Sequence, residues 1–124
     1  MARKVHQIMT VDVACAKEAV PISVAWELME RRQVRHLPVV AADDGNRLVG
    51  FVSDRDLLAA GKHSQAPVAS VMNRTPVSID PQTTIREVCQ LFLKKRFDAA
   101  PVADGEGNLL GLVTTSDLLR TLAS

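Results

Sequence analysis

Apolar residues recur at helical spacing in one stretch of each half of the chain. In the first half, Ile22, Ala25, Trp26 and Met29 follow the i, i+3, i+4, i+7 pattern, while charged residues take the other side. The pattern predicts an amphipathic helix with Pro21 in its first turn and places Trp26 in the core or at a dimer contact. The corresponding helix of the second half is expected to start at position 80 or 83 and to bury Ile85, Val88, Cys89 and Phe92.

Short apolar and β-branched runs predict the strands. Residues 34–40 and 48–52 flank the turn Asp43-Asp44-Gly45-Asn46, and residues 99–103 and 109–113 flank a second glycine-containing turn, so each half should hold a β-hairpin. Pro38 indicates a sheet edge or a strand start, because proline cannot donate to a ladder. Extended segments at 11–15 and 75–79 precede the first helices, and further helices at 54–60 and 116–122 follow the hairpins. Each half is therefore predicted as β-α-β-β-α.

The two halves are copies of one another. With an offset of 63 positions, Pro38-Val39 falls on Pro101-Val102, and after the first turn an offset of 61 places Gly50 on Gly111 and Asp56 on Asp117. The expected domains are a first repeat over 1–61, a linker over 62–67 and a second repeat over 68–124. Neither half is long enough to bury its own sheet, so an α+β fold with the repeats packed face to face about a pseudo-twofold axis is predicted. Ligand-binding clefts are expected between them.

Composition narrows the classes of function. The chain has 124 residues, 47% of them apolar, which is enough for a hydrophobic core. A net charge of +1 and the absence of tyrosine argue against a nucleic-acid or membrane surface as the main role. Cys15 and Cys89 have no CxxC spacing, so two reduced thiols in a cytoplasmic protein are expected. No apolar run near the first residues resembles a secretory signal or a membrane span.

A hydroxyl and a carboxylate three residues apart occur where a strand meets a helix in each copy. Ser53-x-x-Asp56 and Thr114-x-x-Asp117 fit a capping box, and the same groups are also able to hold a ribose and its phosphate. The residues alone leave both interpretations open. The three histidines lack metal-ligand spacing, and Asp54 and Asp56 have no nucleophile or base beside them. We therefore expect neither a metal site nor an enzyme.

The repeat carries two recognisable stretches, Leu37-Pro38-Val39-Val40 before a turn and Gly50-Phe51-Val52-Ser53-Asp54-Arg55-Asp56-Leu57 with its second copy. Together these features resemble a tandem pair of CBS domains, modules first named from cystathionine β-synthase. The resemblance covers about residues 5–122. It implies a pseudo-symmetric unit that dimerises, binds adenosine-containing ligands and regulates an enzyme, channel or transporter. The chain is similar to the stand-alone version, with no room for a catalytic domain, so a partner enzyme or transporter would be regulated in trans.

The resemblance also implies roles for individual residues. The ribose-binding acids would be Asp56 and Asp117. Phosphate would be bound by Ser53, Arg55, Thr114, Ser116, Arg35 and His36. The adenine would lie against Val13, Ala14 and Leu37 in one site and against Thr75, Val77 and Ala100 in the other.

Two hypotheses follow. In the first, the protein is a non-enzymatic sensor of an adenine nucleotide or a related adenosyl compound. Its sites are expected to be unequal, since Arg35-His36 of the first copy is matched by Asp98-Ala99 in the second, where Asp98 would repel a phosphate. In the alternative, the sites are vestigial and an apolar helix face mediates homodimer or partner contact. The sequence does not distinguish AMP, ADP, ATP, S-adenosylmethionine and NAD as ligands.

Overall fold

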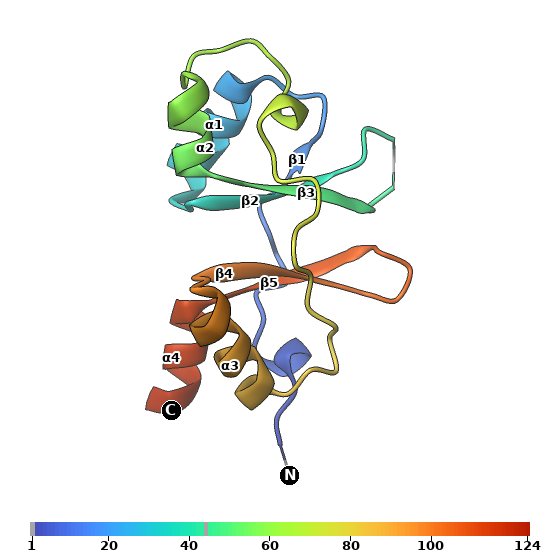
Figure 1. Ribbon diagram of the computed structural model, residues 1–124, viewed down its shortest axis with the longest axis vertical. Helices are drawn as coiled ribbons and strands as arrows, with labels where there is room; N and C mark the ends of the chain where they lie inside the picture. The colour runs from blue at the N-terminus through green and yellow to red at the C-terminus, as the bar shows by residue number, and fades with distance from the viewer. Residues whose placement is uncertain (1, 44) are drawn as a thin grey trace. The chain divides into compact units, whose positions relative to one another are not determined.

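The computed structural model describes residues 2–43 and 45–124, which form two compact units (Figure 1). Unit 1 contains the residues up to Val13 and those from Val77 onward, and unit 2 contains Ala14–Pro76. Each unit combines a β-hairpin with two α-helices, which confirms the mixed α+β class and the two repeats. The units do not coincide with the two sequence copies, because the first residues of each copy pack with the other copy.

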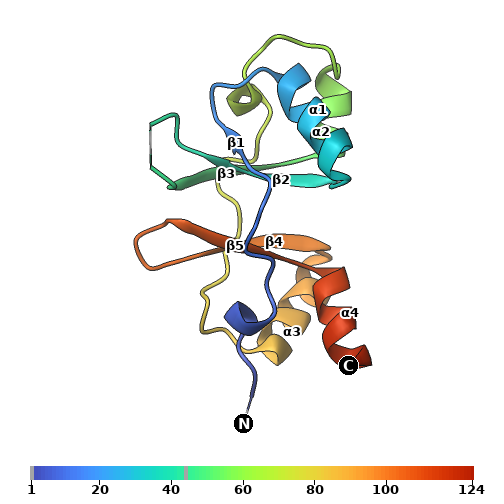
Figure 2. The same cartoon turned by 180° about the vertical axis from the view of Figure 1, so that it is seen from behind.

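Unit 2 is built on a three-stranded sheet with two α-helices on one face. Its elements are β1 (Ala16–Lys17), α1 (Ile22–Arg32), β2 (His36–Val40), β3 (Leu48–Ser53), α2 (Asp54–Ala60) and the 3-10 helix η2 (Val68–Ser70). The strand order is β1-β2-β3, with β1 parallel and β3 antiparallel to β2. Both views show α1 and α2 on the same face of the hairpin (Figure 1 and Figure 2). Leu37, Val52 and Leu57 are fully buried in the core that the hairpin and these helices form.

Unit 1 repeats this plan with a two-stranded sheet. Its elements are the 3-10 helix η1 (Val5–Gln7), α3 (Ile85–Lys95), β4 (Ala99–Ala103), β5 (Leu109–Thr114) and α4 (Thr115–Ala123). Here the extended segment before α3 is reduced to a parallel bridge between Ile79 and Val102. Val5, Val88 and Val113 are fully buried in the core of this unit. The first residues of the chain therefore contribute to the core formed by the second copy.

Hydrogen bonds fix the N-terminal segment in unit 1. The Val5 N–H donates to the Thr83 carbonyl at 2.8 Å. Further along, Thr10 and Leu112 exchange two backbone hydrogen bonds of 2.8 and 2.9 Å. The segment thus adds its backbone to β5, a strand of the second copy.

The segment that opens the second copy is held in unit 2 in the same way. The Val68 N–H donates to the Val20 carbonyl at 2.8 Å, and Phe51 and Asn73 exchange backbone hydrogen bonds of 3.0 and 2.9 Å. Val68 is fully buried in the core of this unit. The two copies have therefore exchanged equivalent leading segments.

Two glycines permit the close approach of these segments. A Cβ atom at Gly111 would lie 2.7 Å from the Thr10 carbonyl oxygen, and one at Gly50 would lie 3.0 Å from the Asn73 carbonyl oxygen. Both contacts are with backbone, which cannot rotate away as a flexible side chain can. Glycine is therefore needed here for space rather than for an unusual backbone angle.

The structure corrects several expectations about element boundaries. Pro38 lies in the central strand β2 rather than at its start, but β1 pairs only with Val39 and Val40, so the β1 side of Pro38 is a local edge. Residues 11–15 form no strand, and the strand begins at Ala16. Of the predicted first turn, Asp44 lies outside the described residues, and the Gly45 N–H donates to the Asp43 carboxylate at 2.9 Å.

The helix starts also differ from prediction by one or a few residues. Pro21 is the N-cap of α1 and precedes its first turn, and α3 begins at Ile85 with Thr84 as N-cap. Trp26 is partly buried against the core of unit 2, with the Lys62 Nζ 5.6 Å from its ring centroid. That placement is consistent with the packing role expected from its spacing.

Candidate ligand-binding sites

In unit 2, the junction between β3 and α2 holds the first predicted ribose acid. The Ser53 N–H donates to the Asp56 Oδ2 at 2.9 Å, and the Asp56 N–H donates to the Ser53 hydroxyl at 3.2 Å. This is a complete capping box, so the capping interpretation of the motif is realised. Within residues 2–43 and 45–124, the Asp56 Oδ1 accepts no hydrogen bond, so one carboxylate oxygen is still available.

In unit 1, the junction between β5 and α4 holds the second predicted acid, Asp117. Its Oδ2 accepts from the Thr114 N–H at 2.9 Å and from the Thr114 hydroxyl at 3.1 Å. Its Oδ1 is also occupied, by the Arg120 guanidinium at 2.5 Å and the Thr10 hydroxyl at 3.5 Å. Only 3% of the Asp117 side chain is exposed. The two junctions therefore share their capping geometry but differ in the state of the second oxygen.

A third capping box shows what the motif does without a predicted ligand. The Thr84 N–H and hydroxyl donate to one Glu87 oxygen at 3.0 and 2.8 Å, and the Glu87 N–H donates to the Thr84 hydroxyl at 3.1 Å. These hydrogen bonds, that of the Thr84 backbone first, lower the pKa of Glu87 below its ordinary value of 4.5. Capping alone is thus a sufficient structural reason for a hydroxyl and an acid three residues apart.

The predicted phosphate-binding residues of unit 2 lie around the same junction. The Arg35 carbonyl accepts from the Asp54 N–H at 2.9 Å, which ties the start of β2 to the start of α2. The His36 ring stacks on Phe51, with the centroids 5.5 Å apart and the planes 10° apart. Arg35 and Arg55 are exposed. Both arginines are therefore free to reorient toward an anion near Asp56.

Unit 1 offers fewer donors at the equivalent place. The Asp98 carbonyl accepts from the Thr115 N–H at 3.0 Å, as the Arg35 carbonyl does in unit 2. Ala99 is buried and has no side-chain donor, and Ser116 is exposed on α4. The copies thus differ in charge at matched positions of the same backbone arrangement.

The predicted adenine-contacting residues are distributed between the two units. Ala14 and Thr75 belong to unit 2, and Val13 and Val77 belong to unit 1. Leu37 and Ala100, which are 0% and 2% exposed, lie in the core of their units and present almost no surface. Any apolar contact at these places would come mainly from the other four, of which Thr75 and Val77 are exposed.

Sequence reasoning missed two contributors at the junctions. Thr10 reaches Asp117 only because the N-terminal segment packs with the second copy, and no local sequence pattern predicts this packing. Arg120 follows Asp117 by three residues, a spacing at which side chains on a helix meet, so the sequence did contain this signal. Among residues 2–43 and 45–124, no His, Cys, Asp and Glu side chains gather into a metal-binding group.

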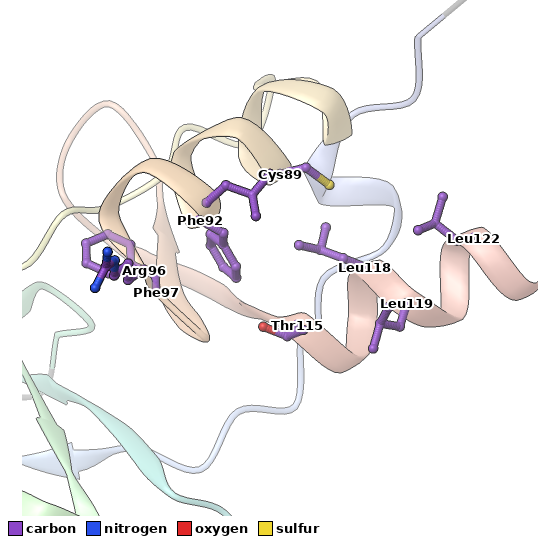
Figure 3. A pocket seen from close by; sticks show the side chains of 9 residues that line it. Cys89, Phe92, Arg96, Phe97, Thr115, Leu118, Leu119 and Leu122 are labelled. Atoms are coloured by element: carbon purple, nitrogen blue, oxygen red, sulfur yellow. The ribbon is translucent and has the colours of Figure 1, made fainter.

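A separate hollow of about 470 Å³ opens between α3 and α4 of unit 1 (Figure 3). It is lined almost entirely by apolar side chains from both helices, namely Cys89, Phe92, Leu93, Arg96, Phe97, Thr115, Leu118, Leu119 and Leu122. We call it the α3–α4 groove. Three of its leucines, at 93, 119 and 122, are 81%, 58% and 78% exposed.

None of the described helices is both long and apolar enough to cross a membrane.

Comparisons with known proteins agree on one family. The family model described as "CBS domain" matches residues 5–63 and 68–124. The inosine-5'-monophosphate dehydrogenase of Thermoplasma acidophilum is 34% identical over 122 residues, but the chain spans only 24% of its length. A CBS domain-containing protein of Bacillus subtilis, YhcV, is 32% identical over 118 residues, which are 92% of this chain and 81% of that protein.

Solved structures show the same architecture. CBSX2, a CBS-pair protein of Arabidopsis thaliana, was solved in complex with AMP and matches with a TM-score of 0.87 and 30% identity, over 97% of this chain and 96% of that one. The cytosolic domain of the Mg²⁺ channel MgtE in complex with ATP matches with a TM-score of 0.83 and 29% identity, over 95% of this chain and 48% of that one.

Proposed function

Because this chain belongs to the CBS domain family, we propose that it is a non-enzymatic regulatory module that binds an adenosine-containing ligand, with AMP, ADP and ATP as the ligand class. The observation that carries this proposal is the Asp56 carboxylate, which caps α2 with one oxygen while its other oxygen accepts no hydrogen bond from any described residue. A carboxylate oxygen accepts hydrogen bonds from the vicinal hydroxyls of a ribose. Two similar structures were solved with AMP and with ATP, which supports an adenine nucleotide.

The proposed roles follow the two junctions. Asp56 and Asp117 accept from ribose hydroxyls. Donors to phosphate are Ser53, Arg55, Thr114, Ser116, Arg35 and His36. Contact with the base is assigned mainly to Val13, Ala14, Thr75 and Val77, with little from the buried Leu37 and Ala100. Unit 2 is the stronger site in this proposal, because it combines the free oxygen of Asp56 with the exposed cations Arg35 and Arg55.

Regulation in this proposal requires a partner. The similar proteins include inosine-5'-monophosphate dehydrogenase and the Mg²⁺ channel MgtE, so an enzyme or a transporter is the proposed class of partner, contacted in trans. A ligand can regulate the activity of such a partner only if it binds two arrangements of the module with different affinities.

A thermal-shift series with AMP, ADP and ATP tests the proposal, with GMP as the control for phosphate and ribose without adenine. A ligand at a hundred times its dissociation constant stabilises the folded state by about 2.7 kcal/mol. We expect a rise in melting temperature with at least one adenine nucleotide and a smaller rise with GMP. Equal melting temperatures under all conditions would remove the sensor proposal.

The α3–α4 groove supports a second function, self-association. In unit 2 the positions equivalent to Leu93 and Thr115 are Glu30 and Asp54, so the matching face carries two carboxylates. Burying these against the leucines of the groove would cost desolvation energy. A second copy's α3–α4 groove is therefore the fitting occupant, because a two-fold contact buries both sets of leucines at once.

Light scattering after size exclusion tests this contact. We expect the wild-type protein to elute with twice the chain mass of 13.5 kDa. Leu119→Asp should reduce the mass to that of a single chain. Leu58→Asp is the matched control at the equivalent position of α2, where the side chain is 52% exposed, and should remain a dimer. A monomeric wild-type protein, or a dimer that Leu119→Asp leaves intact, would exclude the groove as the interface.

A further inference from the structure

The second carboxylate oxygen differs between the two junctions. Asp117 Oδ1 accepts from the Arg120 guanidinium and the Thr10 hydroxyl, while Asp56 Oδ1 has no such partner among the described residues. The other oxygen is engaged in both by the backbone N–H of the N-cap residue at 2.9 Å, and Asp117 Oδ2 also accepts from the Thr114 hydroxyl at 3.1 Å. The larger difference thus lies at the oxygen that capping leaves available to a ligand.

The residues that create this difference are identifiable in the sequence. Arg120 lies three residues after Asp117, and the residue three after Asp56 is Ala59, whose side chain has no donor. Thr10 and Asn73 hold equivalent places in the exchanged segments, since they pair with Leu112 and Phe51 of matching strands. Of these two residues, only Thr10 donates a hydrogen bond to the carboxylate of its junction. Among the described residues, Arg120 alone makes a charged contact with Asp117, so it is the stronger of the two competitors.

We propose that Arg120 is an internal competitor for the Asp117 carboxylate, which makes the unit 1 site bind adenosyl ligands more weakly than the unit 2 site. This inference rests on the proposed ribose-binding role of the two acids. A ribose diol gains access to Asp117 Oδ1 only by displacing the guanidinium. At Asp56 the same hydrogen bonds form without any displacement.

The geometry makes such displacement feasible at a measurable cost. The Arg120 side chain is 72% exposed, so once released it is hydrated by solvent, whereas the Asp117 side chain is 3% exposed and depends on a partner. A charge-assisted hydrogen bond of this kind accounts for about a tenfold difference in affinity. The ligand concentration at which unit 1 fills should therefore exceed that of unit 2 by about this factor. The module then responds over two concentration ranges.

Reciprocal substitutions test the competitor by calorimetric titration with AMP. Arg120→Ala should strengthen the weaker binding step about tenfold and leave the stronger step unchanged. Ala59→Arg places the same side chain three residues after Asp56 and should weaken the stronger step. Arg86→Ala is the control, since it removes one positive charge from unit 1 without any ion pair to Asp117. Circular dichroism checks that each variant is folded.

The outcomes separate this inference from the proposed function. If the wild-type protein binds AMP and Arg120→Ala leaves both steps unchanged, the competitor role is wrong while the sensor function stands. Weaker binding in Arg120→Ala would make Arg120 a ligand contact and would also overturn the inference. If neither the wild-type protein nor any variant binds AMP, the proposed function fails, and the competitor role fails with it.

Discussion

At the scale of single residues, Gly111 is required because another backbone passes where a side chain would be. Gly111→Ala brings a Cβ to 2.7 Å from the Thr10 carbonyl oxygen, so the exchanged segment must move. We expect the free energy of unfolding to fall by about 1–3 kcal/mol, the usual cost of overpacking. Urea denaturation measures this change.

Gly105→Ala is the control for that substitution. A Cβ at Gly105 meets no atom within 4 Å, and its unfolding free energy should stay within about 0.5 kcal/mol of the wild-type value. Equal stability of the two variants would show that the N-terminal segment does not press against β5 as described.

Residue roles were predictable from the sequence where the cause is local. Ser53 with Asp56 and Thr114 with Asp117 form the capping boxes that their three-residue spacing indicated. Thr10 was not predictable as a partner of Asp117, because 107 positions of chain separate them and only the tertiary fold brings them together. The ligand-binding roles of the same residues remain predictions, since capping accounts for their geometry equally well.

At the scale of elements, the capping box of α3 makes stability depend on pH. The pKa of Glu87 is lower in the folded protein than its ordinary value of 4.5, chiefly because of the hydrogen bond from the Thr84 backbone. Its contribution to stability is therefore present above pH 4.5 and is lost as the pH falls through the lowered pKa. Glu87→Gln should be less stable than wild type at pH 7.

The difference in unfolding free energy between these two proteins should narrow as the pH is lowered from 7 to 3. At low pH the wild-type carboxyl is protonated and, like the amide, carries no charge. Thermal melts across this range give the comparison. A gap that stays constant would show that the charge of Glu87 does not contribute to the cap.

Periodic patterns predicted the helices and hairpins well, and boundary errors arose where tertiary contacts decide. Apolar spacing identified α1 and α3, but Pro21 and Thr84 cap these helices from outside, so α1 starts at Ile22 and α3 at Ile85 rather than at position 80 or 83. Residues 11–15 have strand-like composition but pair with no strand, since the chain passes there from one unit to the other. Ala16 and Lys17, which follow this stretch, form β1 instead.

At the scale of the whole molecule, the sequence repeat was visible but the exchange of leading segments was not. Ile8-Met9 and Val71-Met72 are similar, so each segment is compatible with either hairpin by local pattern. Which hairpin each segment packs against depends on where the connecting chain allows Val5 and Val68 to enter a core. Such information is distributed over the entire chain and cannot be read from one window.

The central claim is that the chain binds an adenine nucleotide through the free oxygen of Asp56. Asp56→Asn keeps a carbonyl oxygen to accept the Ser53 N–H and so preserves the cap, but it removes the negative charge that strengthens hydrogen bonds from ribose. Asp54→Asn is the control, because it changes the same charge in the same turn of α2.

Calorimetric titration of the wild-type protein, Asp56→Asn and Asp54→Asn with AMP is the most direct measurement. We predict that wild type and Asp54→Asn bind AMP alike, and that Asp56→Asn weakens the stronger step at least about tenfold while its melting temperature without ligand changes little. Equal AMP affinity in all three proteins, or no binding to the wild-type protein, would contradict the account and leave Asp56 as a helix cap alone.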